Sequence, residues 1–186
     1  YTANKRPLER VFGVDLIYFN ASRKSIVMVQ YKMLERRVSR TGIEDWSYTP
    51  DSQLNKELSR MRKFGADEKT TAQDYRLNAR VFYFKFVKRI GTPKPQAIIL
   101  PLDHFEALLA ESAAPATKNP VRVSYNALDG RYLRETTFLE LVSAGYIGSP
   151  ATTTEYLRAL IEQTISSGRA AVVGVQRGEG LVIGEA

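Results

Sequence analysis

Three polar side chains interrupt two otherwise apolar segments near the start of the chain. Asp15 lies in GVDLIYFN, and Gln30 and Lys32 lie in SIVMVQYKML, with ASRK between the two segments. If an antiparallel hairpin pairs Asn20 with Ser25, Asp15 falls opposite Gln30. Lys32 shares a face with Gln30, because residues two apart on a strand point the same way. A carboxylate, an amide and an ammonium on one sheet surface could hold a divalent metal and a water beside a phosphodiester.

The same residues form a pattern that resembles a known nuclease family. Gly13-Val14-Asp15 opens one apolar strand, Gln30-Tyr31-Lys32 closes the next, and a helix is expected to follow. This arrangement resembles the PD-(D/E)XK nuclease superfamily over residues 9–64, and the glutamine resembles its Mrr-type restriction endonuclease branch. The resemblance implies an α/β fold: a central mixed β-sheet flanked by helices, in a restriction-endonuclease-like core with a C-terminal α/β extension.

The resemblance also implies a role for each residue of the pattern. Asp15 and the Gln30 amide oxygen would bind Mg²⁺ or Mn²⁺, and the backbone carbonyl of Tyr31 would complete the site. Lys32 would orient or deprotonate the attacking water and stabilise the charge that develops on the phosphorus centre. Mg²⁺ prefers hard oxygen ligands and keeps several waters, so substrate phosphate would have to supplement this small set. The implied reaction is hydrolysis of DNA phosphodiester bonds, as in bacterial restriction or antiviral defence.

One expected feature of the family has no clear counterpart. The family usually carries an acidic residue on a helix before the first strand, and Glu9 is the sole acid among the residues that precede Asp15. Three explanations are open: the helix lies upstream in a longer protein, Glu9 substitutes for that acid, or the element is absent.

Simpler interpretations of the same side chains stand beside the catalytic one. Asp15 and Lys32 could form a plain salt bridge, and Gln30 could be a satisfied interior amide. Gln53 and Glu57, on the helix expected next, could face the site, although exposure to solvent is the ordinary expectation for both.

The charge of the chain favours a polyanionic partner. Lys and Arg number 27 against 20 Asp and Glu, which gives a net charge of +7. Such a balance is typical of proteins that bind nucleic acid, although it also occurs in ordinary basic proteins. The residues that we expect to contact DNA are Arg36, Arg37, Lys56, Arg60 and Lys63. Other candidate partners are a second copy of the chain and an upstream domain of the same protein.

Composition argues against several other classes. The chain has no cysteine and a single histidine, His104, which leaves no thiolate site and no histidine-rich nuclease centre. No apolar run approaches the roughly 18 residues of a membrane span, so we expect no membrane partner. No P-loop or G-x-S-x-G motif occurs. These features are consistent with a cytoplasmic location.

Periodicity and turn residues predict the remaining elements. We expect a nuclease-like core over residues 1–100 and an extension over 101–186. Loops are expected at 39–47, 65–74, 91–95 and 112–120, and a Gly-rich tail at 177–186. The predicted strands are 14–20, 25–32, 80–87, 97–100, 121–125 and 171–175. The predicted helices follow a Thr49 cap up to Gly65, then 103–111, 136–144 and a segment from a Thr152–Glu155 capping box to Gly168.

Two functions of other classes stay open from the sequence. One is a non-catalytic nucleic-acid-binding or protein-interaction domain that keeps the nuclease-like fold. The other is an assembly module in which residues 121–186 form an oligomer interface.

Overall fold

The structure is a computed structural model that describes residues 11–64, 70–88, 97–113, 123–166, 172–176 and 181–185. The chain forms two compact units, which are described separately. The first comprises Tyr1–Gln30, Gln53–Phe82 and Leu139–Ala186, and the second comprises Tyr31–Ser52 and Tyr83–Phe138. Within the described part of the chain, no helix is both long enough and apolar enough to cross a membrane.

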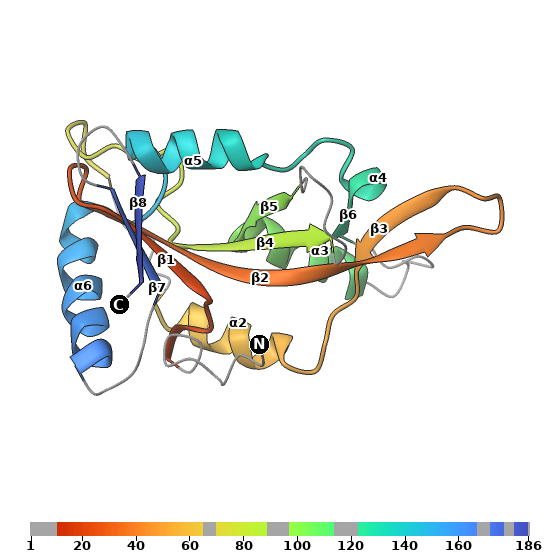
Figure 1. Cartoon of the computed structure of the whole chain (residues 1–186), viewed down its shortest axis with the longest axis horizontal. Coiled ribbons are helices and arrows are strands. Elements are labelled where there is room, and N and C mark those ends of the chain that lie inside the picture. The colour runs from red at the N-terminus through yellow and green to blue at the C-terminus, as the bar shows by residue number, and fades with distance from the viewer. Residues whose placement is uncertain are drawn as a thin grey trace. The chain divides into compact units, whose positions relative to one another are not determined.

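The first unit is built on a mixed sheet in the order β2-β1-β7-β8 (Figure 1). Strand β1 (Leu16–Asn20) pairs antiparallel with the first part of β2 (Ser25–Val38), and Asn20 lies opposite Ser25. Strand β7 (Val172–Gln176) is parallel to β1, and β8 (Leu181–Glu185) is antiparallel to β7. The C-terminal strands therefore complete the sheet that the N-terminal hairpin begins.

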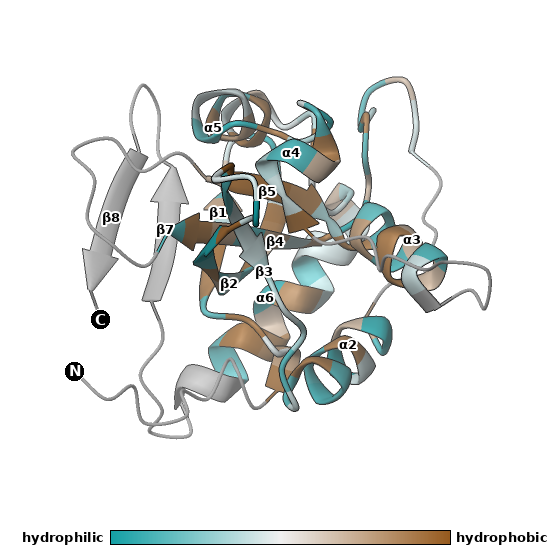
Figure 2. Ribbon diagram, turned by 90° about the vertical axis from the view of Figure 1, so that its right-hand side faces the viewer, coloured by the Kyte–Doolittle hydropathy of each residue, from teal (hydrophilic) through white to brown (hydrophobic). Residues whose placement is uncertain are grey.

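Helices α2 (Leu54–Arg62) and α6 (Ala151–Ser166) belong to this unit, and α5 (Glu135–Ala144) begins at its border. Helix α2 buries Leu54, Leu58 and Met61, which recur at helical spacing. The helix ribbons in Figure 2 alternate between brown and teal, as expected for helices with one face in the core.

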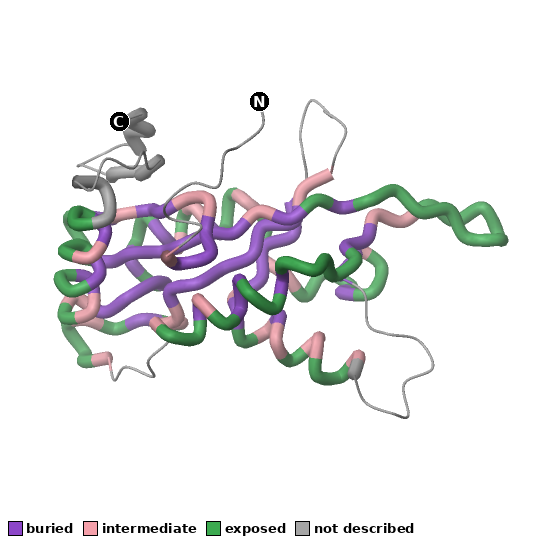
Figure 3. The backbone as a smooth tube through the Cα atoms, turned by 90° about the horizontal axis from the view of Figure 1, so that it is seen from below, coloured by how far each residue is buried: buried purple, intermediate pink, exposed green. Residues whose placement is uncertain are grey.

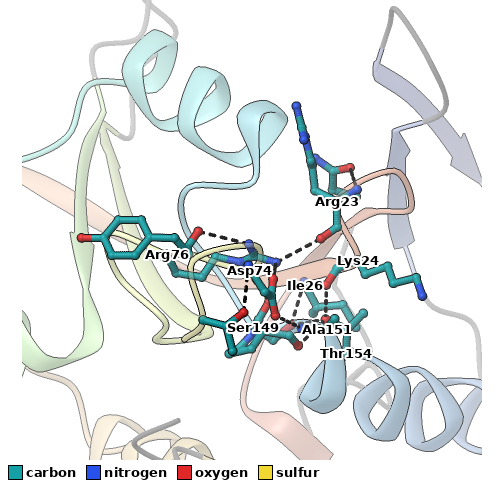
Figure 4. A network of polar contacts seen from close by, with 12 residues as sticks. Arg23, Lys24, Ile26, Asp74, Arg76, Ser149, Ala151 and Thr154 are labelled. Carbon is teal, nitrogen blue, oxygen red and sulfur yellow. Dashed lines mark hydrogen bonds and ion pairs between the residues drawn. The ribbon is translucent and has the colours of Figure 1, made fainter. Parts of the chain in front are cut away.

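A polar network fixes the turn of the hairpin to the start of α6 (Figure 4). Arg76 is 8% exposed and forms an ion pair with Asp74 at 2.6 Å. Its guanidinium also donates to the carbonyl oxygens of Ser149 and Arg23, at 3.3 and 3.0 Å. Asp74 in turn accepts a hydrogen bond from the Ala151 N–H at 2.7 Å. Asp74 thus compensates the buried charge of Arg76 and also binds a backbone N–H at the start of α6, where the helix itself offers no acceptor.

The second unit contains the rest of β2, with β4 (Phe82–Lys88) beside it and β5 (Ile98–Pro101) antiparallel to β4. At the far end of β2, β3 (Glu44–Tyr48) pairs antiparallel with it, and β6 (Val123–Ser124) pairs with β3. Helices α3 (Leu102–Ala113) and α4 (Tyr125–Leu128) complete the unit.

Aromatic packing forms the core of the second unit. Phe84 and Phe86 of β4 place their ring centroids 4.5 and 5.5 Å from that of Phe105 on α3. Tyr48, at the end of β3, lies 5.2 Å from Phe86. These separations are typical of favourable aromatic pairs, which therefore hold α3 and β3 against β4.

The structure confirms the predicted fold class and most of the predicted elements. The hairpin has the predicted register. Three further strands and two helices occur within one or two residues of their expected bounds. They are the strands expected at 80–87, 97–100 and 171–175 and the helices expected at 103–111 and 136–144. The segments 65–69, 91–95 and 114–120, together with Glu9 and Gly168, lie outside the described residues. The division of the chain at residue 100 stays a prediction.

Four predictions of secondary structure were wrong in whole or in part. The loop expected at 39–47 becomes strand from Glu44, because β3 pairs with an extension of β2 whose polar residues obscure the two-residue period. The tail at 177–186 contains β8. The strand expected at 121–125 is present as β6 at Val123–Ser124, but Tyr125 already belongs to α4, and residues 121–122 lie outside the described residues.

The fourth error concerns the helix starts. Helix α2 begins at Leu54, and the Thr49 hydroxyl accepts a hydrogen bond from Arg37 instead of capping the helix. Helix α6 begins at Ala151, so Thr152 is already helical and cannot form the predicted capping box.

Candidate active site

The β1–β2 hairpin brings Asp15 beside the strand that carries the other candidate residues. The Asp15 N–H donates to the Val29 carbonyl oxygen at 3.0 Å, and ladder pairing starts one residue later, with Leu16 opposite Val29. Asp15 is half-buried, whereas the neighbouring Gln30 on β2 is only 5% exposed. A carboxyl group and a buried amide therefore lie at adjacent positions of the hairpin.

Gly13 explains why the segment before Asp15 can lie close to α2. Its φ is +73°, in the left-handed region that favours glycine. A Cβ at this position would lie 3.1 Å from the Glu57 carbonyl oxygen and 3.2 Å from the Glu57 Cα. The glycine of the G-x-D pattern is thus required both by backbone conformation and by the close approach to the helix.

Gln30 and Lys32 share one face of β2, as predicted. Along this part of the strand Gln30, Lys32 and Leu34 are buried, while Tyr31 is half-buried and Met33 is exposed. Lys32 is 6% exposed. Lysine is rarely buried to this extent without a partner for its charge, so its environment is specific.

Asp51 provides a partner for Lys32. Its Oδ2 lies 3.0 Å from the Lys32 Nζ, and its side chain is 47% exposed. The Tyr48 ring lies 6.0 Å from the same ammonium. The sequence did not identify Asp51 as this partner, because the helix expected after Thr49 would contain Asp51, whereas α2 begins only at Leu54.

Glu57 differs from its predicted environment. The expectation that it is solvated is wrong, because it is 4% exposed and lies on the buried face of α2. Gln53 is exposed, as expected. The signal that could have identified Glu57 is its spacing, three residues after Leu54 and four before Met61, which places it on the apolar stripe.

A second buried lysine lies on the opposite face of the second unit's sheet. The Lys85 Nζ is 2.5 Å from Glu135 Oε1 and 5.3 Å from the centre of the Tyr31 ring. Because Tyr31 and Lys32 alternate along β2, Lys85 belongs to the face away from Lys32. Its position inside the apolar run VFYFKFV was a signal in the sequence.

The predicted DNA-contacting residues lie on two elements. Lys56 on α2 and Lys63, directly after this helix, are exposed, and Arg60 on α2 is partly exposed. On β2, Arg36 and Arg37 are exposed, and Arg36 donates to Glu44 Oε2 at 2.7 Å. This hydrogen bond lowers the pKa of the Glu44 carboxyl and raises the pKa of Arg36.

The oxygen donors near the start of the hairpin fit a hard divalent cation in type, although they are few. Among the residues that the structure describes, no group of three or more His, Cys, Asp or Glu side chains could hold a metal ion. The predicted metal ligands are one carboxylate, one amide oxygen and one backbone carbonyl oxygen, so this site does not require three such side chains. It leaves most coordination positions to water and phosphate, which suits Mg²⁺.

Comparisons of the chain with protein families, with curated proteins and with solved structures found no match.

Proposed function

We propose that this protein is a metal-dependent endonuclease that hydrolyses DNA phosphodiester bonds in the cytoplasm, in bacterial restriction or defence. The observation that carries the proposal is the register of the hairpin, which sets Asp15 beside Gln30 at the point where β2 also buries Lys32. A buried amide followed two residues later by a buried lysine is unusual in a strand, because each group costs free energy to desolvate.

Each residue would have a distinct role. Asp15, the Gln30 amide oxygen and the Tyr31 carbonyl would hold Mg²⁺ or Mn²⁺, which when bound polarises the phosphate and the attacking water. Lys32 would orient that water and stabilise negative charge as it develops on the phosphate. Asp51 would position the ammonium, since it lies 3.0 Å from it. The exposed basic side chains of α2 and β2 would contact the DNA.

The test is nicking of supercoiled plasmid by the full chain with Mg²⁺ and with Mn²⁺. We expect Lys32→Met to lower the rate by about 10²–10⁴-fold, the usual effect of losing one charge-stabilising or proton-transfer group. Asp15→Asn should be similarly inactive through loss of metal.

Lys85→Met is the matched control, because it also removes a buried lysine that has a carboxylate partner. If it lowers the rate as much as Lys32→Met, both effects are structural and the assignment of Lys32 is wrong. If the unmodified chain binds DNA but nicks none with either metal, the non-catalytic DNA-binding function replaces the enzyme.

A further inference from the structure

A two-stranded ribbon extends β2 beyond the sheet of the second unit. Residues Glu35–Val38 pair with Glu44–Ser47, and the turn between them is closed by a hydrogen bond from the Ser39 N–H to the Ile43 carbonyl oxygen at 2.8 Å. In Figure 3 the tube of β2 changes from buried to exposed along its length as it enters this ribbon. The ribbon is therefore available to a partner over most of its length.

One face of the ribbon is occupied by contacts within the unit. Arg36 binds Glu44 at 2.7 Å, and the Trp46 Nε1–H donates to the same carboxylate at 3.1 Å. The Lys88 ammonium lies 5.3 Å from the centre of the Trp46 ring. These contacts stabilise the ribbon. They also engage the polar groups of Arg36, Glu44 and Trp46 within the chain.

The other face is hollowed and lined mostly by polar side chains. The hollow has a volume of about 520 Å³. Its polar lining is Arg37, Ser39, Thr41, Asp45, Ser47 and Asn126. Ser47 is only 2% exposed, so the accessible polar lining of the hollow is formed by the other side chains.

The charge of the ribbon distinguishes between two ways of binding nucleic acid. Three basic residues, Arg36, Arg37 and Arg40, are balanced by Glu35, Glu44 and Asp45. A phosphate clamp needs an excess of positive charge and hydrogen-bond donors. A surface that mixes donors with acceptors instead suits the edges of bases, which present both.

We propose that the hollowed face of the ribbon reads a G·C base pair in the major groove of the DNA substrate. Arg37 and Asp45 lie directly opposite each other in the ribbon, so they can reach the two bases of one pair. Arg37, whose Nη2 donates to Thr49 Oγ1 at 2.8 Å in the chain alone, would exchange that contact for O6 and N7 of guanine, and Asp45 would accept from the N4 amino group of cytosine. The major groove is wide enough for a two-stranded ribbon. This inference rests on the proposed action on DNA.

The experiment is selection of bound duplexes from a random-sequence DNA pool by the full chain, with Ca²⁺ in place of Mg²⁺ to prevent cutting. The unmodified chain should enrich a site that contains an invariant G·C pair. Arg37→Gln should reduce the preference at that position by roughly 5- to 150-fold, the discrimination of one good bidentate contact. Asp45→Asn should weaken the same position, because a neutral amide oxygen accepts the cytosine N4–H less strongly than a carboxylate does.

Arg40→Gln is the matched control, since it removes the same charge from the exposed turn of the ribbon and leaves the Arg37–Asp45 pair intact. It should leave the sequence preference unchanged. Three results would overturn the inference. The chain could bind DNA without any base preference, or its preference could survive both Arg37→Gln and Asp45→Asn. The third is that Arg37→Gln abolishes dimerisation of the chain and leaves the DNA preference unaltered. Absence of any DNA binding would remove the proposed function as well, so the two failures are distinguishable.

Discussion

The Lys32 ammonium and the Asp51 carboxylate lie 3.0 Å apart, although one is 6% exposed and the other 47%. The lysine is thus buried on the strand, while its partner remains accessible to water. Such a pair can hold an ammonium in one position and still leave the carboxylate free to exchange contacts with solvent. This asymmetry suits the role proposed for Lys32, which requires an ammonium held in a fixed position.

We expect Asp51→Asn to destabilise the chain by about 1–3 kcal/mol, because it leaves a buried ammonium without this counter-charge. Urea unfolding followed by circular dichroism measures the effect. The double variant Lys32→Met/Asp51→Asn should recover part of the loss, because it removes the charge that had to be compensated. Equal stability of Asp51→Asn and the unmodified chain would show that the ion pair contributes nothing.

Gly13→Ala should cost about 1–3 kcal/mol, through both left-handed backbone strain and contact with the Glu57 backbone. Gly42→Ala is the matched control, because Gly42 has φ +80° but no atom of the described residues lies within 4 Å of its added Cβ. The control should show the backbone strain alone. If the two variants have the same free energy of unfolding, the close approach of α2 to the segment before Asp15 is not a constraint.

The site divides into a part that the sequence could predict and a part that it could not. The Asn20–Ser25 register and the shared face of Gln30 and Lys32 follow from the two-residue period of strands, which is local information. Asp51 and Lys32 are 19 residues apart, and the chain between them includes β3, whose sequence EDWSY has no apolar period. Arg76 and Ser149 are 73 residues apart and meet only through tertiary packing.

DNA binding should depend on salt and on the basic face of α2. If about six phosphates are contacted, the slope of log Kobs against log salt is about −5. The double variant Arg60→Glu/Lys63→Glu should weaken binding to all sequences and make that slope shallower. Fluorescence anisotropy with a labelled duplex measures both quantities.

The control for this pair is Arg131→Glu/Arg134→Glu, which changes the net charge equally at two exposed positions outside α2. An equal loss of affinity in the two double variants would mean that net charge, and not the face of α2, determines binding.

Tyr125 should titrate late at alkaline pH. Burial, followed by the neighbouring Tyr132, raises the pKa of Tyr125 to about 12. The folded state therefore keeps this proton after the unfolded state has lost it near pH 10. The stability from this group is complete below pH 10 and falls as pH rises toward 12. The difference in tyrosinate absorbance between the unmodified chain and Tyr125→Phe reports the titration, and a midpoint near 10 would contradict this assignment.

The last prediction concerns the neutral ligand at the proposed metal site. An amide oxygen attracts a dication less than a carboxylate does, so the affinity of the unmodified chain for Mg²⁺ should be weak. Gln30→Glu adds a charge at almost the same shape and should tighten Mg²⁺ binding, as measured by calorimetry. Because Gln30 is 5% exposed, the new carboxylate should also destabilise the metal-free chain, and Mg²⁺ should restore the loss.

Gln53→Glu is the matched control for this change, because it makes the same substitution at the exposed residue before α2. It should alter neither the Mg²⁺ affinity nor the thermal shift that Mg²⁺ produces. Turnover by Gln30→Glu need not rise with affinity, since the added carboxylate can compete with phosphate for the Lys32 ammonium, two residues along β2. If Gln30→Glu and Gln53→Glu bind Mg²⁺ with the affinity of the unmodified chain, Gln30 is a packing amide and the metal is held elsewhere or not at all.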